Sequence, residues 1–156
     1  MLSKDEEFLQ MIQKEEEELL KKKITHLNLL EEDIEQLKSL PYKNYDGPDK
    51  TSDNYKAYYA TINLSDLIGS ARGHIPGENW FECLADCRRM LNFDPGYSLE
   101  SYKEILLDPD SFDVDYPDVI LYEGKYYIDG GGKHRLTIGK CISASEAKVI
   151  VNEIIK

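Results

Sequence analysis

Three consecutive glycines near the C-terminal end of the chain place the strongest constraint on its fold. The segment Tyr126–Lys140 reads YYIDGGGKHRLTIGK, so that an apolar run ends at Ile128 and a helix-forming segment begins at Lys133. Glycine lets the backbone turn sharply and approach a ligand closely, because it has no Cβ atom. The pattern therefore predicts a strand, a tight glycine loop and a helix over Lys133–Cys141, which requires a mixed α+β domain.

The start of that predicted helix is also a candidate anion site. The N–H groups of a first helical turn have no partners within the helix, and the helix dipole favours negative charge there. Lys133 adds a point charge, Arg135 can clamp phosphate oxygens with two hydrogen bonds, and His134 can move a proton near neutral pH. The alternative is a glycine-rich turn followed by a solvated basic helix start, and the residues alone leave both interpretations open.

The chain of 156 residues divides into three parts of different composition. Residues 1–40 contain no Gly, Pro or Trp and are rich in Glu, Lys and Leu, which predicts a helical extension of two helices, or of one helix weakened around 25–28. Its apolar stripe must pack on the same chain or on a partner, a second copy included. Residues 41–54, with two prolines and a glycine, are predicted to be a linker, and residues 55–156 form the α+β domain.

Local signals place the elements of this domain. Aromatic and β-branched residues favour a strand at 55–63, the dipeptide Glu123-Gly124 indicates a hairpin turn, and Ser98 is a helix N-cap. We expect strands at 55–63, 119–122, 125–128 and 147–155, helices at 78–91, 98–107 and 133–141, and a loop at 64–77.

Charge and apolar content restrict the partners. With 19 Lys+Arg against 30 Asp+Glu, the formal net charge of −11 disfavours nucleic-acid binding, which depends on basic side chains. No apolar run approaches the roughly 20 residues that span a bilayer, and the acidic N-terminus has no apolar signal region. We therefore expect no membrane partner, a cytoplasmic location and three reduced cysteines.

Three further clusters have a structural interpretation that we favour over a functional one. The aspartates of 108–118 could bind Mg²⁺, but we favour a solvated acidic loop. The run also lacks the central Gly and the terminal Glu of a calcium-binding loop, so it is not a site of that kind. Cys83 and Cys87 are four residues apart, and core thiols are favoured over a zinc site that includes His74. The lysines of 21–23 are flanked by glutamates and predict a solvated helix surface. We assign no metal ligand.

The strand–DGGGKHR–helix arrangement, followed by a short turn and a closing strand, resembles the ParB/sulfiredoxin-like superfamily. Gly131–Arg135, GGKHR, is similar to the sulfiredoxin motif GGCHR, and Ile128–Gly130 with the later HRL is similar to the ParB-like nuclease domain. The resemblance covers about residues 55–155, but the similarity is close only over the strand, the DGGGKHR loop and the helix that follows it.

This resemblance implies a nucleotide site. The motif would bind nucleotide phosphates through Gly130, Gly131, Gly132, Lys133, His134 and Arg135, and Arg72 of the preceding glycine-rich loop would add a contact. The nucleotide would be ATP, ADP or CTP with Mg²⁺. Asp129 and His134 are the catalytic candidates, with Asp129 near the metal ion or capping the turn.

One departure limits the chemistry that the resemblance implies. Lys133 stands where sulfiredoxins have their catalytic cysteine, so a sulfiredoxin reaction is excluded. The glycine loop also lacks the motif of chromosome-partition ParB proteins, and we expect no DNA-binding domain of their kind. The resemblance leaves a phosphotransferase or an NTPase, whose chemistry depends on positioning and charge. The alternatives are a non-catalytic interaction module that uses residues 1–40, and a DNA-associated nuclease or regulator of a mobile element.

Overall fold

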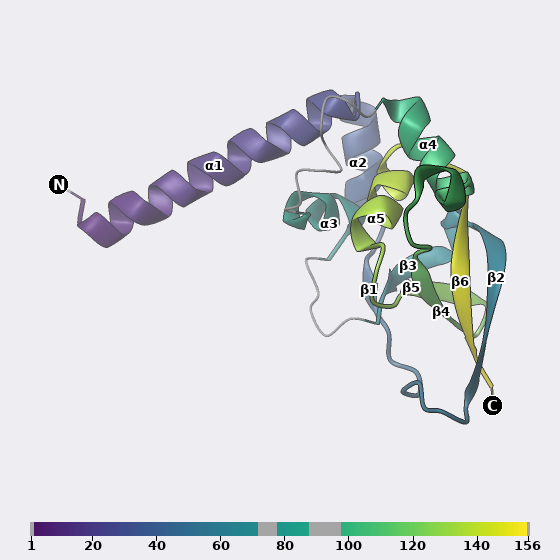
Figure 1. Ribbon diagram of the computed structural model, residues 1–156. Helices are drawn as coiled ribbons and strands as arrows, with labels where there is room; N and C mark the ends of the chain where they lie inside the picture. Colours follow the sequence, from purple (N-terminus) through teal and green to yellow (C-terminus); the bar gives the residue numbers. More distant parts are fainter. Residues whose placement is uncertain (1, 72–77, 88–97, 156) are drawn as a thin grey trace.

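The computed structural model describes residues 2–71, 78–87 and 98–155. Over these residues a six-stranded mixed sheet is combined with helices, and a long helix, α1 (Lys4–His26), stands at the N-terminal end (Figure 1). The strand order is β1-β3-β5-β4-β6-β2. The mixed helix and sheet architecture predicted from the sequence is therefore confirmed at this level.

Parallel and antiparallel pairs alternate through most of the sheet. β2 pairs antiparallel with β6 along its whole length, from Tyr55 opposite Ile154 to Asn63 opposite Glu146. β6 is parallel to β4, β4 is antiparallel to β5, β5 is parallel to β3, and β3 is parallel to β1. The strands are β1 (Lys43–Asn44), β2 (Tyr55–Asn63), β3 (Leu67–Ser70), β4 (Asp118–Tyr122), β5 (Lys125–Ile128) and β6 (Glu146–Ile154).

The predicted hairpin is confirmed and sits in the middle of the sheet. Glu123 and Gly124 join β4 to β5 with φ angles of 51° and 78°. Two consecutive positive φ angles form the turn whose twist matches that of the flanking strands. The hairpin therefore brings the C-terminal end of β5, where the glycine loop begins, next to the first residue of β4.

The shorter helices gather on one side of the sheet (Figure 1). They are α2 (Glu31–Ser39), α3 (Trp80–Asp86), α4 (Leu99–Leu107) and α5 (Lys133–Cys141). Trp80, Leu136 and Val149 are fully buried and belong to one hydrophobic cluster between helices and sheet. α5 contacts both α3 and α4, so the helix that follows the glycine loop lies at the centre of this layer.

The N-terminal segment changes direction between α1 and α2. The sequence predicts a weak point around 25–28, and the structure ends α1 at His26 and gives Asn28 a positive φ of 53°. Leu27 and Leu37 are buried in the same cluster as the residues of the sheet. The first turns of α1 instead extend away from the body (Figure 1). Neither α1 nor any other described helix has the length and apolar composition needed to cross a membrane.

Lys23 corrects the prediction that the three lysines of 21–23 are solvated. Its side chain is 0% exposed, and its ammonium group donates to the carbonyl oxygens of Leu84 (2.9 Å), Ala85 (3.1 Å) and Cys87. These carbonyls lie at the C-terminal end of α3, where helix carbonyls have no partner within the helix. A buried cation thus joins α1 to α3.

Three predicted segments differ from the structure. The loop expected at 64–77 is wrong for its first part, because a short 3-10 helix (Leu64–Asp66) leads into β3. Residues 43–44 of the predicted linker form β1 beside β3. The helix expected at 78–91 is helical over 80–86 and reaches its C-cap at Cys87, and residues 88–91 lie outside the described part.

Candidate functional site

The glycine loop is fixed to the start of β4 by backbone hydrogen bonds. The N–H of Asp129 donates to the carbonyl oxygen of Asp118 (2.9 Å), and the N–H of Asp118 donates to that of Gly131 (3.3 Å). On the other side of β5, the N–H of Ala71, just after β3, donates to the carbonyl oxygen of Ile128 (2.8 Å). The loop therefore leaves the sheet where the C-terminal ends of two parallel strands meet.

The three glycines of this loop have different roles. Gly130 and Gly132 have φ angles of 81° and 92°, which favour glycine. A Cβ atom on Gly132 would lie 2.8 Å from Cα of Pro117, so this position also needs glycine for space. A Cβ atom on Gly131 would meet nothing within 4 Å, and its φ is not positive. The fold therefore does not require glycine at position 131, and there is open space beside this residue.

The N-terminus of α5 points out of this loop without a side-chain cap. Gly132 is the N-cap residue, and it has no side chain that could cap the first turn. The first α5 hydrogen bond runs from the N–H of Leu136 to the carbonyl oxygen of Gly132 (2.9 Å). Three helical residues, the predicted Lys133, His134 and Arg135, thus precede the first bonded N–H. This arrangement of amides suits a negatively charged group.

Lys133 is held by an ion pair that the sequence did not predict. Its Nζ lies 3.0 Å from Oδ2 of Asp86 on α3, and the lysine side chain is only 12% exposed. Sequence reasoning missed Asp86 because it lies 47 residues away along the chain. The charge of Lys133 at the glycine loop is therefore already partly balanced.

Arg135 has a buried donor that lacks a partner. Its Nη1 atom is buried, and among the described residues no hydrogen-bond acceptor reaches it. Burial lowers the pKa of the Arg135 guanidinium, while the nearby carboxylate of Asp115 opposes this shift. Arginine remains charged in proteins, so this is an incompletely satisfied cation beside the loop. An unsatisfied buried donor costs about 1–3 kcal/mol.

The two catalytic candidates occupy different surroundings. Oδ2 of Asp129 accepts a hydrogen bond from Nζ of Lys50 at 3.0 Å, and both side chains are partly exposed. Lys50 lies in the stretch predicted as a linker and was not predicted as a site residue. His134 is half-buried on the first turn of α5. The predicted phosphate contact Arg72 lies outside the described residues.

The acidic loop lies close to this region but does not form a metal cluster. Asp110, Asp113, Asp115 and Asp118 line a hollow of about 490 Å³ together with Tyr59 and Tyr116. Within the described residues, no three His, Cys, Asp or Glu side chains are arranged to hold a metal ion. Cys83 and Cys87 are buried thiols, as the core interpretation predicts, and Cys141 is buried as well. His74 lies outside the described part.

The three thiols are buried, and their surroundings differ: the hydrogen bond with Cys87 lowers the pKa of Cys83. Oxygen Oγ1 of Thr137 on α5 lies 3.4 Å from Sγ of Cys83 on α3. The hydrogen bond to Cys83 and burial raise the pKa of Cys87, and burial raises the pKa of Cys141. These residues pack α3 against α5 and so fix the position of the glycine loop.

We found no family model, no curated protein and no solved structure that matches this chain.

Proposed function

We propose that the chain binds the phosphate groups of a nucleotide at Gly130–Arg135. The observation that carries this proposal is the buried Nη1 of Arg135, which has no acceptor among the described residues and lies on the first turn of α5. A phosphate oxygen would satisfy the guanidinium donor and could accept hydrogen bonds from amides at the start of α5. The open space at Gly131 would allow the ligand to approach the backbone.

The ion pair between Lys133 and Asp86 sets a condition on this binding. With Nζ of Lys133 3.0 Å from the carboxylate, the lysine contributes little net positive charge to an incoming anion. Replacing Asp86 by Asn would leave that charge uncompensated. We therefore expect Asp86→Asn to bind phosphate groups more tightly than the wild-type protein does.

The reaction class is part of the proposal. ATP, ADP or CTP would enter with Mg²⁺, and phosphotransfer or NTP hydrolysis would follow. Asp129 would then lie close enough to the loop to orient the metal ion, and His134 would assist proton movement. The bond between Asp129 and Lys50 is partly exposed, so the carboxylate can change partner when a metal ion arrives. The support for binding comes from Arg135, and turnover rests on the family resemblance.

Calorimetric titration of ATP, ADP and CTP with Mg²⁺ tests the proposal. Arg135→Ala should weaken binding at least about tenfold, which corresponds to the loss of one charged hydrogen bond. Gly131→Ala should weaken it as well, although the added methyl group meets nothing in the protein. Lys125→Ala is the matched control, since it removes one exposed positive charge on β5. Equal binding by all four proteins, or no binding of any nucleotide to the wild type, would refute the proposal.

A further inference from the structure

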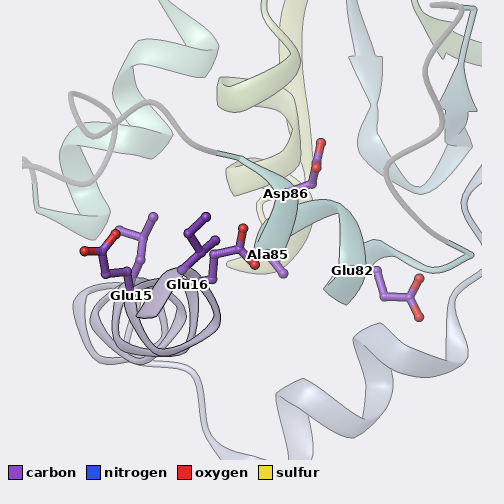
Figure 2. A pocket seen from close by; sticks show the side chains of 7 residues that line it. Glu15, Glu16, Glu82, Ala85 and Asp86 are labelled. Carbon is purple, nitrogen blue, oxygen red and sulfur yellow. The ribbon is translucent and has the colours of Figure 1, made fainter. Parts of the chain in front are cut away.

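A groove with an apolar floor runs between α1 and α3. It has a volume of about 560 Å³. Its apolar residues are Ile12 and Leu19 from α1 and Ala85 from α3, and Figure 2 shows the lining side chains. The side chain of Glu16 extends from α1 towards Ala85 in this view. The groove thus lies where the projecting helix passes the body of the protein.

The apolar floor continues along α1 away from the body. Phe8, Ile12 and Leu19 lie within about 40° of one another around the helix, given 100° per residue. Phe8 is 58% exposed, and Leu9 and Met11 beside it are also more than half exposed. An apolar helix stripe exposed in this way indicates a surface that another molecule covers. From Phe8 to Leu19 it extends about 16 Å, or three helical turns.

The charges around the groove identify the kind of molecule that fits. Among the described residues that line it, the charged ones are Glu15, Glu16, Glu82 and Asp86, and of these Asp86 is paired with Lys133. The rim is acidic overall, so a partner that brings positive charge beside its apolar side chains fits it best. A second copy of α1 fits poorly, because residues 4–20 carry seven acidic residues and two lysines, which would place like charges together.

We propose that this groove, with the stripe that leads to Phe8, binds a basic amphipathic helix of a partner protein. The partner helix presents apolar side chains at i, i+3 and i+4 spacing to Ile12, Leu19 and Ala85. Its flanking lysines or arginines face the acidic rim. The groove borders the proposed nucleotide site through Asp86, but its binding does not need a nucleotide and is tested without one.

A designed peptide tests the proposal. The probe is a fluorescein-labelled 15-residue peptide with leucines at i, i+3 and i+4 positions and lysines on either side, and binding is measured by fluorescence anisotropy. We expect saturable binding at one peptide per chain. A scrambled peptide of the same composition and a peptide with glutamates in place of the lysines should bind at least tenfold more weakly.

Two arginine substitutions separate the groove from the general negative charge of the protein. Ala85→Arg places a positive charge on the floor of the groove and should weaken peptide binding at least tenfold. Ala57→Arg makes the same change at an exposed alanine on β2 and should leave binding within twofold of the wild type. Ile12→Asp, on the projecting part of α1, should act like Ala85→Arg.

Three results would overturn the proposal. The first is equal weakening by Ala85→Arg and Ala57→Arg, which would indicate attraction by net charge alone. The second is equal binding of the ordered and scrambled peptides. The third is a wild-type dimer in sedimentation equilibrium that Ala85→Arg dissociates, because a second copy would then occupy the groove.

Discussion

Replacing the buried Lys23 by methionine should destabilise the protein through the end of α3. The substitution keeps most of the side-chain volume and removes the ammonium group that donates to three carbonyl oxygens, those of Leu84, Ala85 and Cys87. A hydrogen bond from a charged donor contributes about 1.5–3 kcal/mol, so three contribute roughly 5–9 kcal/mol. The variant no longer buries a charge, and this offsets several kcal/mol of the loss in the free energy of unfolding. The expected net loss is about 2–5 kcal/mol in the free energy of unfolding.

Urea denaturation monitored by the fluorescence of Trp80 measures this loss. Trp80 is the single tryptophan, is 1% exposed and is the first residue of α3, so its emission reports on the affected helix. A loss of 2–5 kcal/mol also lowers the melting temperature by about 5–15 °C in a domain of this size. Far-UV circular dichroism should give the same midpoint.

Lys22→Met is the matched control for this experiment. Lys22 is exposed on the same turn of α1, so its replacement should change the free energy of unfolding by no more than about 0.5 kcal/mol. If Lys23→Met and Lys22→Met are equally stable within that margin, the three carbonyl contacts do not stabilise α3. A more stable Lys23→Met would mean that burial of the charge costs more than its hydrogen bonds return.

Two further changes test other parts of the structure. Gly132→Ala forces a positive φ on alanine and a contact with Pro117, so it should cost about 2–5 kcal/mol in urea denaturation, whereas Gly131→Ala should stay within about 0.5 kcal/mol of the wild type. Burial and a 2.7 Å hydrogen bond to Glu153 raise the pKa of Tyr58 to about 12, so the folded state keeps a proton that the unfolded state releases above pH 10. Stability should therefore fall between pH 10 and 12, and the fall in the urea midpoint should be shallower in Tyr58→Phe; equal slopes in the two proteins would contradict this assignment.

Elements with a local signal could be predicted from the sequence. The strand at 55–63 has the predicted bounds, because its aromatic and β-branched residues fit an extended backbone. Ser98 caps α4 as predicted, with its side chain accepting a hydrogen bond from the N–H of Ser101. The strand, glycine loop and helix around Gly132 also follow from local composition, since each residue type restricts its own backbone.

Features that depend on distant partners could not be predicted in the same way. β3 is only four residues long, and it is a strand because it pairs with β5 and β1, which are far away in the sequence. Lys23 looks like its solvated neighbours until α3 supplies carbonyl oxygens more than 60 residues along the chain. The partners of Lys133 and Asp129 at the candidate site lie 47 and 79 residues away along the chain. Composition indicates which groups carry charge, and tertiary packing decides which charges meet.

Lys23 fixes the C-terminal part of α1 to the end of α3, so the rest of α1 acts as a rigid arm. From Lys23 to Lys4 the helix extends about 28 Å at 1.5 Å per residue, so a rotation of about 10° at the anchor displaces the tip by roughly 5 Å. The same relation works in reverse: a load on the tip is transmitted as torque to the end of α3. Asp86, the last residue of α3, is paired with Lys133 at the start of α5. Force on the arm would therefore reach the glycine loop through this ion pair and through the packing of α3 on α5.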